Sequence, residues 1–136
     1  MTSTIVRNVK SAPGVSGDAV FCWYYGCRIA GLTQPPPPAT GNGDWIRVAR
    51  VAGGFVACVG DGSGHGDEAA PRARLMASEF DAALRCGLTV PGNILARINA
   101  ALHARGLLGG AAVVHCDGRR IVAAAAGAPY PVLRRA

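Results

Sequence analysis

Lysine and aromatic residues are scarce in this sequence. Lys10 is the single lysine beside thirteen arginines, and 6% of the 136 residues are aromatic, although the net charge is +6. Domains that bind nucleic acid combine a clustered basic surface with aromatic side chains that stack on bases. Here the arginines occur as scattered pairs without interleaved aromatics. The composition therefore argues against nucleic acid as a partner.

Paired cysteine motifs and long hydrophobic runs are missing as well. No two of the five cysteines are separated by two residues, the spacing of zinc knuckles and redox motifs. The first ten residues lack the apolar run of a secretion signal. The most apolar early stretch, residues 19–32, is too short to span a bilayer and contains Arg28. We therefore expect a cytoplasmic protein with reduced thiols and no membrane partner.

The hydrophobic pattern predicts strands, then two helices, then further strands. This order is typical of an α+β fold in which antiparallel, sandwich-like β-sheets are flanked by two long helices. Pro71 is tolerable only in the first turn of a helix, so we expect the first helix to begin late or to bend there. The expected elements are strands at 19–25, 45–51, 55–59, 111–116 and 119–125 and helices at 69–84 and 91–105.

A proline-rich segment divides the chain. Residues 34–43 read QPPPPATGNG, which can form neither a helix nor a central strand. We interpret residues 1–42 as an N-terminal strand region that ends in this loop. Residues 43–136 are then the main domain.

The segment GDGSGHG at residues 60–66 lies between a predicted buried strand and a helix. Its glycines allow a sharp turn and a close approach to a ligand. A phosphate-binding P-loop needs Lys after its last glycine, whereas Asp67 and Glu68 follow here. The dinucleotide-binding spacing fails because His65 or Asp67 occupies the third glycine position. A nucleophile elbow around Ser63 fails because its flanking glycines are absent.

Asp61 is left as the informative residue of this segment. It ends a buried strand in a turn that leaves its carboxylate open, and Mg²⁺ and Mn²⁺ prefer carboxylate and carbonyl oxygens, such as that of Gly62. Asp44 stands 17 residues earlier, at the start of the partner strand of a predicted hairpin. We therefore expect Asp44 and Asp61 to converge at one end of a sheet, as a two-metal site requires. Asp44 can also be read as a turn residue beside Asn42.

These motifs resemble those of PPM-type protein phosphatases, the type 2C-like enzymes. The residues GDW at 43–45 and GDGSGHGDEAA at 60–70 look like the first two metal motifs, and the latter carries the G-D-x-S-G-H-G signature of the stage II sporulation protein E branch. The segment AAAAGAPYPVLRR at 123–135 is similar to a later strand motif of that branch. GVSGDAVF, which contains Asp18, offers an alternative to Asp44 as the first metal-binding position.

The resemblance implies a phosphoserine or phosphothreonine phosphatase in which water between two Mg²⁺ or Mn²⁺ ions attacks the phosphate. It implies that Asp61 bridges the ions, that Gly62 offers its carbonyl, and that Asp44 binds the second ion. His65 is a candidate general acid or phosphate contact, or else a residue that hydrogen-bonds locally at the helix start. The implied substrate is a phosphorylated regulatory protein, such as an anti-sigma-factor antagonist of a bacterial switch.

The resemblance also implies two further metal aspartates beyond the matched region. This sequence has no side-chain carboxylate after Asp117. We therefore expect an incomplete phosphatase fold that binds metal weakly and leaves a sheet edge uncovered, which favours a homodimer. A non-catalytic, phosphatase-like binding module is the alternative function.

Overall fold

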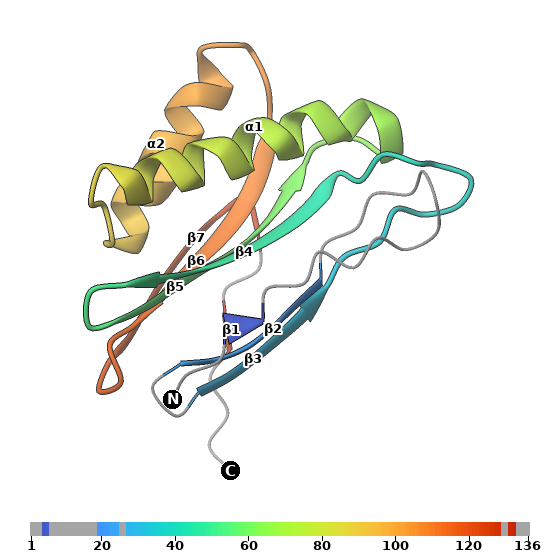
Figure 1. Cartoon of the computed structure of the whole chain (residues 1–136). Coiled ribbons are helices and arrows are strands. Elements are labelled where there is room, and N and C mark those ends of the chain that lie inside the picture. Colours follow the sequence, from blue (N-terminus) through green and yellow to red (C-terminus); the bar gives the residue numbers. More distant parts are fainter. Residues whose placement is uncertain (1–3, 6–18, 25–26, 129–130, 133–136) are drawn as a thin grey trace.

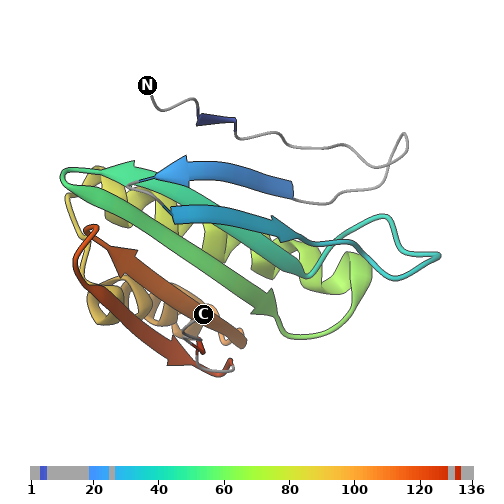
Figure 2. The same cartoon turned by 90° about the horizontal axis from the view of Figure 1, so that it is seen from below.

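The computed structural model describes residues 4–5, 19–24, 27–128 and 131–132, and these form three layers (Figure 1). Two helices cover one face of a central sheet, and a smaller sheet lies on the other face (Figures 1 and 2). The elements in chain order are β1 (Thr4–Ile5), β2 (Ala19–Tyr24), β3 (Cys27–Leu32), β4 (Asp44–Val51), β5 (Gly54–Gly62), α1 (Gly66–Arg85), α2 (Pro91–His103), β6 (Gly109–Cys116) and β7 (Ile121–Ala126).

The central sheet is antiparallel, with strand order β4-β5-β6-β7. Tight turns connect β4 to β5 and β6 to β7, and both turns contain a glycine with positive φ, Gly53 at 76° and Gly118 at 85°. Along β4, β5 and β6, successive side chains alternate between the helical layer and the smaller sheet. The alternation of residues 45–51 correctly predicts the strand β4.

The smaller sheet has the order β1-β2-β3 and packs against the outer face of the central sheet. Cys27 and Ile29 of β3 contact an apolar cluster formed by Ile46, Phe55 and Cys116. The predicted α+β architecture, with sandwich-like sheets flanked by two helices, is confirmed. The division at residues 42 and 43 stays a prediction.

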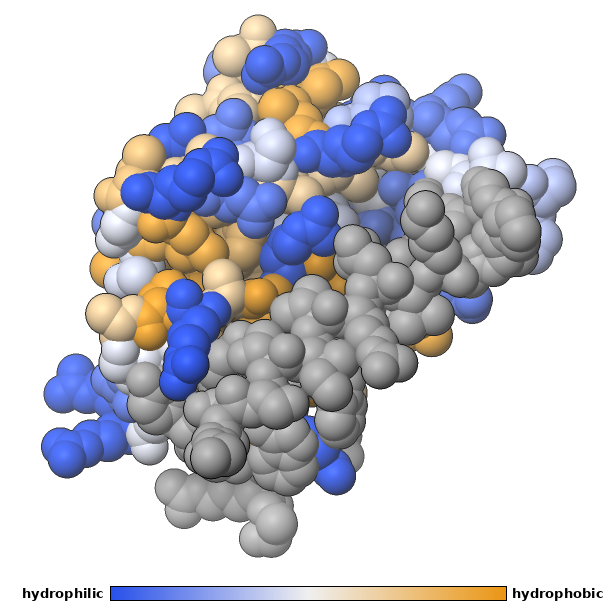
Figure 3. Space-filling model, viewed as in Figure 1, coloured by the Kyte–Doolittle hydropathy of each residue, from blue (hydrophilic) through white to orange (hydrophobic). Residues whose placement is uncertain are grey.

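The surface mixes hydrophilic side chains with apolar residues that reach the solvent between them (Figure 3). Within the described part of the chain, no helix combines the length and hydropathy needed to cross a bilayer. The exposed large apolar side chains are Leu32, Val59, Val90, Leu108, Ile121, Val122 and Val132.

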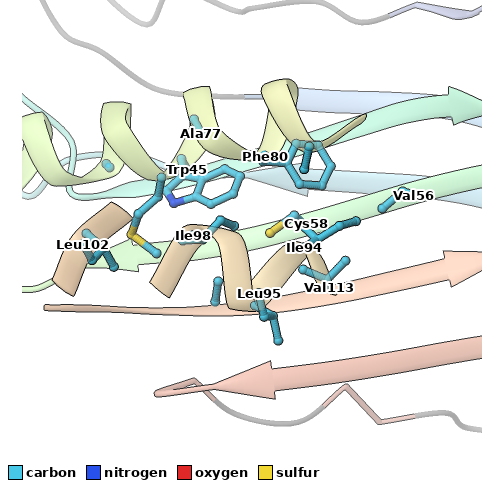
Figure 4. Packing of buried hydrophobic residues seen from close by; sticks show 14 residues of the cluster. Trp45, Val56, Cys58, Ala77, Phe80, Ile94, Leu95, Ile98, Leu102 and Val113 are labelled. Atoms are coloured by element: carbon cyan, nitrogen blue, oxygen red, sulfur yellow. The ribbon is translucent and has the colours of Figure 1, made fainter. Parts of the chain in front are cut away.

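The main core lies between the helices and the central sheet (Figure 4). Trp45 of β4 packs against Phe80 of α1, with ring centroids 6.0 Å apart and planes tilted by 56°. Ile94 and Ile98 place one face of α2 in the same core, as their spacing predicts. This packing fixes α1 over the end of β5, where the glycine-rich segment begins.

Three differences from the expected elements bear on the candidate site and its surroundings. The strand β3 was not predicted, although Cys27 and Ile29 alternate with exposed neighbours. The strand β5 continues to Gly62, so Asp61 is a strand residue and not part of a loop. The helix α1 starts at Gly66 and contains Pro71 in its second turn, so the expected late start is wrong. One missing backbone hydrogen bond is offset there by the packing of the neighbouring alanines, Ala70 among them.

Candidate metal centre

Asp44 and Asp61 are direct neighbours across β4 and β5. The Gly62 N–H donates to the Gly43 carbonyl over 2.8 Å, so the next pair along the ladder, Asp44 and Asp61, is a pair without mutual backbone hydrogen bonds. Consistent with this pattern, the Asp44 N–H points away from β5 and donates to Asn42 Oδ1 over 3.1 Å. Side chains approach most closely at such pairs. The predicted convergence of the two carboxylates is confirmed in register.

The pKa of Asp44 reflects its position opposite Asp61. Both residues are exposed at the rim of the sheet. Partial burial raises the pKa of Asp44, and the negative charge of Asp61 raises it further. Like charges directly opposite each other destabilise a sheet. A bound cation would remove this repulsion, so the pair has the electrostatic character of a cation ligand set.

Close packing explains the glycines that flank the carboxylate pair, Gly43 and Gly62. A Cβ on Gly62 would lie 2.8 Å from the Ala73 nitrogen and 2.9 Å from the Ala69 oxygen of α1. A Cβ on Gly43 would lie 2.6 Å from the Ala69 Cβ and 3.3 Å from the Gly62 carbonyl oxygen. The Gly62 carbonyl therefore lies beside the start of β4. These glycines let α1 approach the ends of both strands, a role that the sequence analysis did not predict beside the sharp turn and ligand approach of residues 60–66.

The segment after Asp61 leads directly into α1. His65 occupies the N-cap position with extended backbone angles, and its exposed side chain makes no capping hydrogen bond. Arg72, from the second turn of α1, donates from its guanidinium to the Ser63 carbonyl. Gly64 adopts a φ of 105°, which favours glycine at this turn. The His65 side chain therefore does not cap α1, whereas its carbonyl accepts from the Glu68 N–H over 3.3 Å.

Two polar residues that sequence reasoning did not assign to the site hold the start of β4. Asn42, which is 9% exposed, donates from Nδ2 to Thr33 Oγ1 over 2.9 Å and accepts from the Asp44 N–H. Asp67 Oδ1 accepts from the Gly41 N–H over 2.5 Å and from Thr40 Oγ1 over 3.2 Å. The role of Asn42 could have been inferred from the Asn-Gly-Asp sequence at residues 42–44, because an Asn side chain often accepts from the N–H two residues later.

The donor set fits a hard divalent cation in type but supplies few ligands. Asp44 and Asp61 offer carboxylate oxygens, as Mg²⁺ and Mn²⁺ prefer. Among the described residues, no group of three or more His, Cys, Asp or Glu side chains is placed to hold a metal ion. Asp18, the alternative first ligand, lies outside the described residues. Asp44 pairs with Asp61 in register. The choice between Asp18 and Asp44 as the first metal ligand stays open.

Comparison with known proteins assigns the family. The family model described as stage II sporulation protein E matches residues 52–136, which include Asp61 and His65 but not Asp44. Among solved structures, the SiaA-PP2C domain of Pseudomonas aeruginosa is similar, with a TM-score of 0.56 and 28% identity over 62% of this chain. The similarity covers 36% of that domain, so this chain spans a little over a third of it. No curated protein matches the sequence. The chain belongs to the stage II sporulation protein E family and has part of a PPM-type phosphatase fold.

Proposed function

We propose that this chain supplies the Asp44–Asp61 half of a Mg²⁺- or Mn²⁺-dependent protein serine/threonine phosphatase site. The observation that carries the proposal is the pair of facing carboxylates, one of which lies in the G-D-G-S-G-H-G segment matched by the family. The proposed substrate is a phosphoserine or phosphothreonine of a cytoplasmic regulatory protein, such as an anti-sigma-factor antagonist.

In this mechanism Asp44 and Asp61 would hold the cation, and the Gly62 carbonyl is the candidate for a further oxygen ligand. A divalent cation, when bound, polarises the phosphoryl oxygens and lowers the pKa of a coordinated water. His65, exposed at the start of α1, is the candidate residue to contact the phosphate or to give a proton to the leaving serine oxygen. Arg72 keeps the intervening turn in place through the Ser63 carbonyl.

The second candidate is a phosphatase-like module that binds a phosphorylated partner without hydrolysing it. The small number of carboxylates gathered in the described residues favours this reading. Mg²⁺ keeps its water shell unless several negative ligands converge, so two carboxylates give weak binding. On this reading the glycine-rich turn and His65 recognise the phosphate, and the rate of hydrolysis is negligible.

Phosphate release from an aryl phosphate and a phosphoserine peptide, measured with Mn²⁺ and with EDTA, tests the proposal. We expect slow Mn²⁺-dependent hydrolysis that falls to the EDTA level in Asp61→Asn, which keeps the shape of the side chain but removes its charge. The control variant Asp81→Asn makes the same change near the far end of α1 and should keep wild-type activity. Equal hydrolysis with Mn²⁺ and EDTA would exclude this mechanism, whereas binding of a phosphopeptide without hydrolysis would support the second candidate.

A further inference from the structure

Two cysteines from different sheets meet in the layer between them. Cys27 is the first residue of β3 in the smaller sheet, and Cys116 is the last residue of β6 in the central sheet. Cys116 is 3% exposed and Cys27 is half-buried, and both belong to the apolar cluster around Ile46 and Phe55. Cys116 pairs in register with Phe55, so its thiol faces the interlayer cluster against which Cys27 packs.

The two thiols are neighbours in this cluster. Cys27 packs against the group of buried side chains that includes Cys116. Burial raises the pKa of the Cys27 thiol, and the neighbouring Cys116 thiol raises it further. Both cysteines are free thiols. A raised pKa leaves little thiolate at neutral pH, so we expect this pair to oxidise slowly. Cys27 is partly open to solvent, so an oxidant can reach the pair from one side.

We propose that Cys27 and Cys116 form an oxidisable dithiol that closes to a disulfide between the two sheets when the protein meets a peroxide. The Cys27 sulfur attacks one oxygen of hydrogen peroxide and the O–O bond breaks. The leaving hydroxide takes the thiol proton and departs as water, which leaves a sulfenic acid at Cys27. The Cys116 sulfur then attacks the Cys27 sulfur, the S–O bond breaks, and a second water leaves. The two thiols lose two electrons in total, and these reduce one peroxide to two waters.

The position of the pair predicts what the bond would do. Cys27 starts β3, whereas Thr33, just after the end of β3, contacts the Asn42 side chain that holds Asp44. The disulfide would therefore close the end of the sandwich away from the carboxylate pair. It would fix the smaller sheet on the central one without touching Asp44 or Asp61, so it does not depend on the proposed function.

Peptide mapping of the full chain under non-reducing conditions tests this inference. The reduced protein is treated with hydrogen peroxide, alkylated and digested with trypsin, and we expect residues 11–28 to become linked to residues 106–119. The first peptide also contains Cys22, so a second cleavage by chymotrypsin, after the aromatic residues 23–25, separates the two cysteines. A link that stays with Cys27 supports the inference, and a link to Cys22 overturns it.

Variants provide the second measurement. Cys27→Ser, at the partly exposed member of the pair, should abolish the link, whereas Cys86→Ser, at an exposed cysteine of the α1 end, should leave it intact. Peroxide should raise the thermal midpoint of the wild type by about 5 °C or more, reversibly with dithiothreitol, and should not raise that of Cys27→Ser. An unchanged wild-type midpoint together with free Cys27 and Cys116 after peroxide would overturn the inference.

Discussion

Asp44 and Asp61 face each other across adjacent strands, at a position where a sheet usually avoids like charges. The folded protein raises the pKa of Asp44, so it holds a proton there more tightly than the unfolded chain does. The contribution of Asp44 to stability is therefore largest below about pH 3.9 and is lost as the pH rises through the raised pKa. At neutral pH this residue destabilises the metal-free fold, as is common where a ligand site trades stability for binding.

Asp44→Asn removes one of the two charges while keeping the shape of the side chain. At pH 7 in EDTA we expect a thermal midpoint equal to or above that of the wild type. Mn²⁺ should raise the midpoint of the wild type and leave that of Asp44→Asn unchanged, because the cation relieves a repulsion that the variant lacks. Differential scanning fluorimetry from pH 5 to 8 measures both effects, with Asp81→Asn as the control. A variant clearly less stable than the wild type in EDTA would contradict this account.

Asn42 is the buried polar side chain that fixes where Asp44 begins its strand. Asn42→Ala leaves the Asp44 N–H and the Thr33 hydroxyl without this partner, and it should lower the free energy of unfolding by about 1–3 kcal/mol. Urea unfolding measures this change, and Asn93→Ala, an exposed residue on α2, is the control. Asn42→Asp keeps the acceptor for the Asp44 N–H and should retain more of the Mn²⁺ response than Asn42→Ala. Equal responses of the two variants would argue against a positioning role.

At the scale of elements, α1 is seated against the ends of β4 and β5 because glycines leave room for it. A Cβ on Gly62 would meet backbone atoms of α1, which cannot move without shifting the helix. Gly62→Ala should therefore destabilise the fold by about 1–3 kcal/mol. Gly92→Ala, where a Cβ would meet nothing within 4 Å, should leave stability unchanged or raise it by at most about 1 kcal/mol. Urea titrations of both variants check this, and equal stability would remove packing as the reason for Gly62.

The hairpin that brings Asp44 to Asp61 was predictable from sequence because its turn, its alternation and its length all agree. The sequence indicates a turn at Gly53 and Gly54, and the structure has it one residue earlier, at Ala52 and Gly53, since Val51 pairs with Gly54. The strand β3 was missed because its inward side is made of Cys27, Ile29 and a glycine, a weak apolar signal. Its packing partners lie far away in sequence, and a local pattern cannot contain them. The same applies to Asn42, whose role depends on Thr33 at the end of β3.

For the whole molecule, the two edges of the central sheet differ in how they are protected. The strand β4 carries Asp44, Arg47 and Arg50, and charges on an edge oppose pairing with another chain. The strand β7 has the sequence IVAAAA, without a charge, and Ile121 and Val122 are 52% and 47% exposed. In the described part of the chain, β7 pairs with β6 on one side and ends the sheet. We therefore propose that the expected homodimer forms through the edge of β7.

A lysine on this edge tests that proposal. Val122→Lys places a charge that a paired strand would have to bury, so it should shift the protein towards monomer and improve its solubility. The control Leu108→Lys changes a more exposed apolar residue, at 74%, that precedes β6 and is not on the β7 edge. Sedimentation velocity over a hundredfold range of concentration should show association of the wild type and of Leu108→Lys but much less of Val122→Lys. If the wild type is a monomer throughout, the uncharged edge of β7 is tolerated without a partner, and the proposed dimer is wrong.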